Sequence, residues 1–507
     1  MTLKSILIGG AIAAVALPAA AADDVINMVT SFQIRSMDPV SQGFWMQEFG
    51  QGELLMKFQP DGTITPWLAE SLERTDDTTW VITIRDGVSF QNGRAMDVPA
   101  VLEAIAYHRA RNTGTQAVLP EEATFTQTGD REITVNTGMP VPELPSILAH
   151  ESRLMIIDVE PVLAAGEDYE ALEGAGIHTG PYMVVDLDDQ RMIAERHEGY
   201  WQGMPAMAGV ELRFVSDANA RILAVENGEV DIALYPPISA APVFAATPNV
   251  NLALGAPSTG GFLSVMDVTD GVFEEIAVRR AVMLAVNYEE LANDVFHGAK
   301  IPATGLYNPR FPWAVENYRF DPDAANALLD EAGWLRDGDT RTRDGETLSV
   351  ILMIYPQQPD LVPLSNAMQS YLRAIGIGSE IVSVDSVNEA AMNDLVAWDL
   401  AMVAVGTATV GSVSGFLNRY VACDGDRNFG GYCNDRVEEL IATLDVTVDE
   451  EQRYAMLREI QTILVEEDPY VFNATILIER ALVSDAWSDY VPAVAWNHIK
   501  WDTAPNP

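Results

Sequence analysis

The sequence predicts an α/β protein with two lobes and a strand-rich insertion early in the first lobe. Its length of 507 residues exceeds what one hydrophobic core normally holds, so at least two lobes are expected. Short strands alternate with helices along the whole chain. A strand–helix–strand unit over residues 212–234 implies parallel pairing through a right-handed crossover. A hydrophobic content of 48% against 21% charged residues is typical of a globular protein.

Local periodicity predicts the elements of the first half. Trp80, Ile82 and Ile84 share one face of a half-buried strand, and Asp86-Gly87 marks the turn that follows it. Asp217 is the expected cap of the helix in the strand–helix–strand unit, and Gly228 is expected to end that helix.

The second half of the chain shows the same alternation. Apolar side chains at positions 278, 281, 282 and 285 share one helix face. Asp321-Pro322 is expected to begin another helix, which ends at Gly333. The apolar run 400–405 is typical of a strand covered on both faces. The other expected elements are a strand at 348–354 and helices at 364–375, 437–444 and 457–464.

Residues 1–22 have the pattern of a signal peptide. Lys4 gives a short positive start, residues 6–17 form an apolar run, and Ala20 to Ala22 offer a cleavage site. An uncleaved membrane anchor is the alternative, but the apolar run is short for a membrane span. The remaining chain is therefore expected to be soluble and periplasmic.

The two cysteines, Cys423 and Cys433, are close together in a loop rich in glycine and asparagine. In an oxidising compartment such a pair is expected to form a disulfide. A metal site is the alternative, although no histidine lies near them in the sequence.

The charge balance excludes one class of partner. There are 30 basic and 74 acidic residues, which gives a formal net charge of −44. Such a surface repels nucleic acid and anionic lipid, so no nucleic-acid partner is expected.

No catalytic constellation is visible in the sequence. The stretch Gly411 to Gly415 has the wrong order for a nucleophile elbow, and the six histidines are scattered. The Asp-rich stretch 337–341 has Arg341 where a calcium loop needs an oxygen ligand, so a hairpin is expected there. We expect a protein that is not an enzyme and that has no cofactor and no resident metal; an exported hydrolase is the alternative.

Several segments resemble the extracytoplasmic solute-binding proteins of ABC importers in the peptide/nickel (oligopeptide-binding, family 5) group. The segments occur in the family's order over essentially the whole chain after the signal peptide. They are 61–71, 86–93, Thr179 to Tyr182, Gly199 to Trp201, Asn227 to Asp231, Val278 to Ala281 and Ala324 to Trp334.

The resemblance implies a periplasmic-binding-protein-like fold of type II, a Venus flytrap. Lobe I is expected to comprise 23–257 plus 485–507, with an inserted subdomain at 53–173, and lobe II to comprise 258–484. A small solute or short peptide would bind between the lobes and favour the closed state. The protein, expected to be a monomer, would then deliver the solute to a membrane permease with ATPase subunits.

The resemblance also suggests which residues contact the ligand. The loop after the 400–405 strand is a usual pocket wall, and here it begins Gly406, Thr407, Ala408 and Thr409, without the acid that many peptide-binding relatives use. Arg153 occupies a context similar to an arginine that faces chelate carboxylates in nickel-binding relatives. The alternative for Arg153 is a pair with Glu151 or another surface acid.

Further candidates follow the first strand and lie near the lobe crossing. They are Phe44, Trp45 and Met46 at the first place, and Thr259 and Phe262 at the second. Aromatic and methionine side chains suit a mostly apolar cleft, and core packing is the alternative for each.

The leading hypothesis is an importer's binding protein for a peptide-like or other small solute. A nickel or metal-chelate binding protein of the same family is the alternative. A chaperone-like or sensory binding protein would have the same sequence features.

Overall fold

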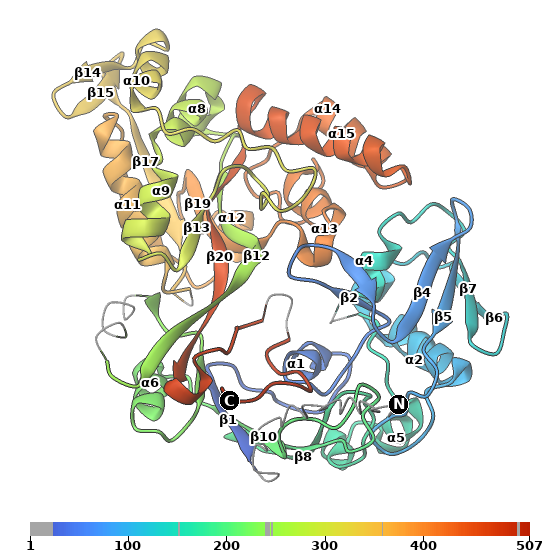
Figure 1. Cartoon of the computed structure of the whole chain (residues 1–507). Helices are drawn as coiled ribbons and strands as arrows, with labels where there is room; N and C mark the ends of the chain where they lie inside the picture. Colours follow the sequence, from blue (N-terminus) through green and yellow to red (C-terminus); the bar gives the residue numbers. More distant parts are fainter. Residues whose placement is uncertain (1–23, 151–152, 239–243, 245–246, 357, 494–496) are drawn as a thin grey trace, which may run out of the picture.

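The computed structural model describes residues 24–507 except 151–152, 239–243, 245–246, 357 and 494–496. Two bodies are joined by two long antiparallel strands, β12 (Val250–Met266) and β20 (Val471–Ser484), which run through both (Figure 1). The predicted signal peptide, 1–22, lies outside the described residues. Within the described part of the chain, the structure has no helix with the length and apolar character that a membrane crossing requires.

The N-terminal body is built on one half of a large mixed sheet. Its strands are β1 (Val25–Thr30), β8 (Tyr182–Leu187), β9 (Arg191–Arg196), β10 (Gly209–Phe214) and β11 (Ile232–Leu234). β10 and β11 flank β1 and are both parallel to it. The two strands of the unit predicted at 212–234 are therefore parallel, as predicted, but each pairs with β1 and they do not pair with one another. The connecting helix, α6 (Ala218–Glu226), is capped by Asp217 as predicted.

The C-terminal body is built on the other half of the sheet. β17 (Ser349–Ile354) is parallel to β18 (Gly378–Ser383) and to β19 (Leu400–Gly406), and β19 is antiparallel to β12. β13 (Lys300–Pro302) pairs with β20. The helices of this body are α8 (Ile276–Ala285), α9 (Tyr288–Glu290), α10 (Pro322–Glu331), α11 (Leu361–Ala374), α12 (Val387–Met392), α13 (Ser414–Phe416), α14 (Asp435–Leu444) and α15 (Glu450–Thr462).

A strand-rich insertion precedes β8. Its four-stranded antiparallel sheet has the order β4 (Ala69–Arg74), β5 (Thr79–Ile84), β7 (Glu132–Asn136), β6 (Thr124–Gln127). The hairpin of β2 (Met56–Phe58) and β3 (Ile64–Pro66) lies between this sheet and the C-terminal body (Figure 1). We call residues 56–165 the insert. Its helices are α2 (Val98–Arg111), α3 (Thr113–Gln116), α4 (Leu144–Leu148) and α5 (Val159–Ala165), and α1 (Gly43–Glu48) precedes it.

The Asp-rich stretch is a hairpin, as predicted. β14 (Leu335–Asp337), β15 (Thr340–Arg343) and β16 (Glu346–Thr347) form a small antiparallel sheet. Arg341 is buried there, and its guanidinium group donates to the carboxylate of Asp330.

The hydrophobic core follows the two sides of the large sheet. One cluster runs without interruption from Ile26 in β1 through Ile82 in the insert to Leu440 in α14. A second cluster fills the C-terminal body under α8 and α11, and a third lies under α6. The first cluster therefore ties the insert to both bodies, in addition to the two crossing strands.

Candidate ligand-binding site

An aromatic cluster lies beside the end of β1. The ring of Phe32 is 5.3 Å from that of Trp45 and 5.2 Å from that of Tyr235, and the rings of Phe44 and Trp45 are 4.8 Å apart. Phe32 is 47% exposed, whereas Phe44 and Trp45 are half-buried. Phe44 and Trp45 were predicted from the sequence as ligand contacts. Phe32 and Tyr235 were not predicted, and they complete the cluster. The third predicted neighbour, Met46, is fully buried in the core.

The predicted pocket-wall loop is held against β12. The amide and the hydroxyl of Thr407 both donate to the carbonyl of Thr259, each at 3.2 Å, and the amide of Ala408 donates to the same carbonyl at 3.4 Å. Two predicted segments, separated by about 150 residues, are therefore in direct contact. Gly406 is exposed, Thr409 is half-buried, and Thr407 and Ala408 are buried. Phe262, from the predicted crossing, is fully buried in the C-terminal core.

Arg153 lies near the C-terminal end of the insert and is half-buried. In the sequence it is far from the residues of the aromatic cluster. Its carbonyl accepts a hydrogen bond from the hydroxyl of Thr115 at 2.8 Å. Burial, and then the positive charge of Arg153, lower the pKa of His150 to about 3. The guanidinium group therefore acts on His150, which is neutral at physiological pH.

A buried polar group connects α1 with the C-terminal tail. The Glu48 carboxylate accepts from the hydroxyl of Tyr235 at 2.9 Å, and its Oε1 lies 3.3 Å from Nε2 of His498. The other oxygen of Glu48 is buried without a hydrogen-bond partner among the described residues. The hydroxyl of Tyr490 donates to the carbonyl of His498 at 3.2 Å. Burial, and then the charge of Glu48, raise the pKa of Tyr235 well above its usual range. We call Glu48, Tyr235, Tyr490 and His498 the tail cluster.

Glu479 adds a second carboxylate next to the tail cluster. It lies on β20 between the residues paired with β13 and those paired with β11, which is where the strand passes from one body to the other. Burial raises the pKa of Glu479, Glu48 adds to the rise, and His498 is the strongest of the groups that oppose it.

One contact between the insert and the C-terminal body is made by the carboxylate of Glu143 at the start of α4. This carboxylate accepts hydrogen bonds from the hydroxyl of Ser412, from the amides of Val413 and Ser414 at 3.3 and 3.4 Å, and from Nη2 of Arg453 at 3.0 Å. The side chains of Glu143 and Arg453 are only 15% and 12% exposed. This contact holds the chain directly after the pocket-wall loop.

Arg310 makes a second contact on the same side of the molecule. Its Nη1 donates to the carbonyl of Pro60 in the β2–β3 turn at 2.6 Å and to that of Pro257 in β12 at 2.8 Å. The guanidinium group lies over the rings of Phe58 and Phe311. Burial lowers the pKa of Arg310 to about 10, so the side chain remains charged at neutral pH.

Three hollows in the surface lie away from the predicted site residues. One of about 590 Å³ is bounded by α8, α10 and residues 465–467 in the C-terminal body. One of about 460 Å³ lies between Asp38, α2 and α5. One of about 110 Å³ lies between α1, Lys57 and the tail at 497–502. None of the predicted site residues lines these three hollows.

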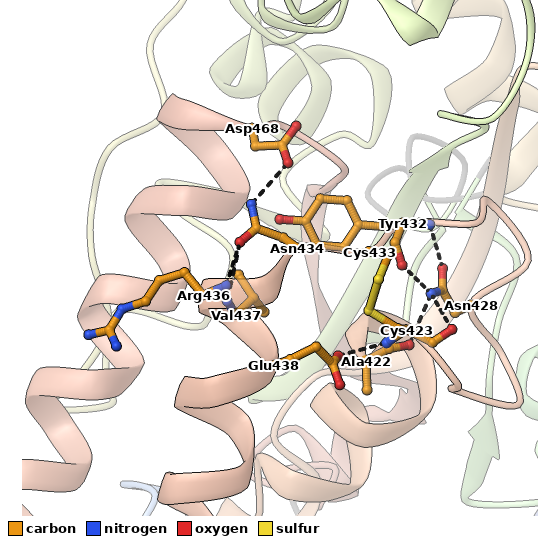
Figure 2. Close-up of a disulfide and its surroundings, with 10 residues drawn as sticks. All are labelled: Ala422, Cys423, Asn428, Tyr432, Cys433, Asn434, Arg436, Val437, Glu438 and Asp468. Atoms are coloured by element: carbon orange, nitrogen blue, oxygen red, sulfur yellow. Dashed lines mark hydrogen bonds between the residues drawn. A yellow bond between two sulfur atoms is a disulfide. The ribbon is translucent and has the colours of Figure 1, made fainter.

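Cys423 and Cys433 form the predicted disulfide (Figure 2). Around it, the amide of Cys423 donates to the Glu438 carboxylate at 2.7 Å, and the side chain of Asn428 bonds to the backbone of Tyr432. The bridge therefore closes the loop between α13 and α14. Among the described residues there is no group of three or more His, Cys, Asp or Glu side chains that could hold a metal ion.

The residues that sequence reasoning missed are polar groups that only the fold brings together. Glu143 and Ser412 are 269 residues apart in the chain, and Tyr235 and His498 are 263 residues apart. One signal was available, because Glu479 and Arg480 interrupt the otherwise apolar run from Ile476 to Val483.

Comparisons with known proteins agree with the fold. Residues 63–428 match the family described as bacterial extracellular solute-binding proteins, family 5. The chain is 27% identical over 416 residues to the nickel-binding protein NikA of Staphylococcus aureus, which covers 82% of this chain and 80% of that protein. It is 28% identical over 485 residues to the glutathione-binding protein GsiB of Salmonella paratyphi A, covering 90% of each.

Solved structures match as well. The nickel ABC transporter protein from Bacillus halodurans superimposes with a TM-score of 0.79 at 24% identity, covering 94% of this chain and 99% of the other. The periplasmic binding protein DppA of Helicobacter pylori, in complex with the peptide STSA, gives 0.69 at 17% identity, covering 94% and 97%. The predicted fold class is therefore confirmed.

Proposed function

Because the chain belongs to the family-5 bacterial extracellular solute-binding proteins, we propose that it captures a peptide-like or other small solute between two lobes and delivers it to the permease of an ABC importer. Members of this family are binding proteins of ABC importers and are not enzymes. The observation that carries the proposal is the family match along 63–428, a range that runs through the insert and both bodies.

The proposed lobes follow the two bodies. Lobe I comprises 23–257 plus 485–507, with the inserted subdomain at 53–173, and lobe II comprises 258–484. The crossing of β12 and β20 between the bodies supports this division, because strands that pass between lobes form a natural hinge. We further propose that residues 1–22 direct export to the periplasm, and that the protein acts there as a monomer.

The proposed ligand site is built around the crossing strands. The exposed ring of Phe32 and the half-buried rings of Phe44 and Trp45 form its wall in lobe I, and Gly406 to Thr409 form its wall in lobe II. Aromatic walls with a few polar groups are typical of small-molecule sites. Arg153 supplies a carboxylate-binding group, because a guanidinium group can bind a carboxylate through two parallel hydrogen bonds.

A metal chelate, nickel foremost, is the second candidate ligand. The relative NikA of Staphylococcus aureus is named for nickel, and GsiB of Salmonella paratyphi A is named for glutathione. Histidine, the chelator in a solved NikA complex with nickel, and glutathione both carry carboxylates, so the proposed role of Arg153 is the same in each case.

Mass spectrometry of the solute released from denatured, purified protein tests the proposal. We expect one compact solute at near-stoichiometric amount, and titration calorimetry with that solute then gives the affinity. Arg153→Ala should weaken binding about ten-fold or more, since a charge-assisted hydrogen bond contributes roughly 1.5–3 kcal/mol. Unchanged affinity of Arg153→Ala would exclude Arg153 as the anchor. A released solute that has been chemically altered by the protein would favour the alternative function, that of an exported hydrolase.

A further inference from the structure

We propose that Glu479 binds the cationic group of the ligand, an ammonium or guanidinium group, at the point where β20 passes between the bodies. This inference rests on the proposed function and adds the chemical class of the guest. It is carried by three observations, which are the direction in which the side chain points, its lack of a partner and the occupation of the neighbouring cations.

The direction follows from the alternation of side chains along β20. Ala481 and Val483 face the core cluster that also contains Ile26 and Ile499, whereas Leu482 faces the cluster under α6. Since successive strand residues point to opposite faces, Glu479 shares the side of Ala481 and Val483. That side carries α1 and the C-terminal tail, which is consistent with the electrostatic coupling of Glu479 to Glu48 and His498.

The carboxylate of Glu479 has no partner among the described residues. It accepts no hydrogen bond and forms no ion pair within the portion of the chain that the structure describes. The residue as a whole is half-buried, and its two carboxylate oxygens are not among the completely buried polar atoms that lack a hydrogen-bond partner. Protein therefore surrounds most of the side chain, and the described residues supply no partner for its carboxylate. An unpaired carboxylate in such a place is costly unless a partner arrives.

The nearest cations are already engaged. Arg480 donates to the carbonyl of Pro236 at 2.7 Å and to Asp360 at 3.0 Å, and Nζ of Lys300 lies 3.0 Å from the same oxygen of Asp360. Asp360 and Pro236 thus hold both cations on the other face of β20. Neither cation can neutralise Glu479 at close range without breaking a buried pair.

The groups facing Glu479 favour a cation. On its own side of the strand, Glu479 is coupled electrostatically to Glu48 from α1, to Tyr235 from the segment after β11, and to Tyr490 and His498 from the tail. Lys300 and Arg480 act on it from the other face of β20. On the open side, two carboxylates face one histidine. The aromatic cluster adjoins this group through Tyr235 and offers ring faces, which attract cations. A short peptide with a free amino group carries such a cation.

The test compares two probe mixtures on the full chain after export. One is an equimolar mixture of dipeptides with free amino groups, and the other is the same mixture N-acetylated. Retention is measured by equilibrium dialysis and mass spectrometry for the wild type, for Glu479→Gln, and for Glu380→Gln. Glu380 is exposed on β18, so its variant removes the same charge far from the crossing.

The wild type and Glu380→Gln should retain free-amine dipeptides about ten- to a hundred-fold better than acetylated ones, as expected for one charge-assisted contact. Glu479→Gln should lose that preference. Circular dichroism verifies that each variant is folded.

Equal retention of the two mixtures, full retention by Glu479→Gln, or retention of neither mixture would overturn the inference. Other outcomes distinguish failure of the proposed function from failure of the role of Glu479. A copurifying solute without a cationic group leaves the binding protein intact and removes only the role of Glu479, whereas no copurifying solute and no retention of dipeptides or of nickel–histidine removes both.

Discussion

Two glutamates at the junctions between the bodies have opposite surroundings. Glu143, where the insert meets the C-terminal body, accepts hydrogen bonds from Ser412, Val413, Ser414 and Arg453. Glu479, where β20 passes between the bodies, accepts none from the described residues. Each residue is at least partly buried, so the difference lies in the partners and not in exposure.

The comparison separates a structural carboxylate from an unpaired one. A carboxylate whose donors all come from the opposite body stabilises the arrangement of the bodies, because those donors are lost when the bodies separate. A carboxylate without donors contributes nothing to that arrangement and raises the free energy of the ligand-free protein. Glu143 is thus expected to govern closure, and Glu479 is expected to govern what is bound.

The largest effect on the free energy of unfolding is expected for Glu143, the carboxylate that accepts several hydrogen bonds. Glu143→Ala removes the partner of Arg453 and of two backbone amides, and breaking such a half-buried pair costs about 3 kcal/mol of the free energy of unfolding. Urea unfolding measures this loss. Hydrogen exchange at the amides of Val413 and Ser414 should accelerate in the same variant, since both amides donate to Glu143.

A double-mutant cycle with Arg453→Met isolates the ion pair. We expect a coupling energy of about 1–3 kcal/mol, because each single variant leaves the other charge without its partner. A loss of less than about 0.5 kcal/mol in Glu143→Ala, with unchanged exchange at Val413 and Ser414, would mean that this junction does not hold the bodies together.

A smaller effect is expected at the second contact on the same side. Arg310→Met removes two hydrogen bonds to the carbonyls of Pro60 and Pro257 and keeps an apolar side chain against Phe58 and Phe311. Two nitrogens of Arg310, Nε and Nη2, are buried without partners in the described structure, and this offsets part of the loss. We expect about 1–2 kcal/mol by urea unfolding. A loss as large as that of Glu143→Ala would place the main junction at Arg310 instead.

The sequence was sufficient for features that depend on neighbours in the chain. The strand at 80–84, the cap Asp217, the hairpin at 335–343 and the disulfide follow from patterns within about ten residues. The pairing of β10 and β11 with β1 could be predicted only as parallel, because the intervening strand lies about 180 residues earlier.

The candidate site was predictable only in part. The segments at 44–45, 259 and 406–409 were identified through the family resemblance, and the contact of Thr259 with Thr407 unites two of them. The partners of Glu143 and the surroundings of Glu479 depend on which side chains converge across hundreds of residues. No local pattern encodes that convergence, although the charged pair Glu479-Arg480 within an apolar strand signalled an unusual position.

The smallest effect is expected for the stability of Glu479→Gln, and its sign distinguishes the two carboxylates. Burial raises the pKa of Glu479 in the folded protein above the ordinary glutamate value of 4.5, which applies to the unfolded chain. The folded state therefore binds the proton more tightly, and this contribution is fully present below the unfolded pKa and is lost as pH rises through the folded pKa. At pH 7 the charged carboxylate destabilises the folded protein, so Glu479→Gln should be more stable than the wild type by about 0.5–1 kcal/mol.

The difference in stability should shrink toward pH 4, where the wild-type side chain is protonated. Urea unfolding at pH 4 and pH 7 measures it, with Glu380→Gln as the control for net charge. A variant less stable than the wild type at pH 7 would show that Glu479 is already paired in the ligand-free protein, and it would then belong with Glu143 as a structural group.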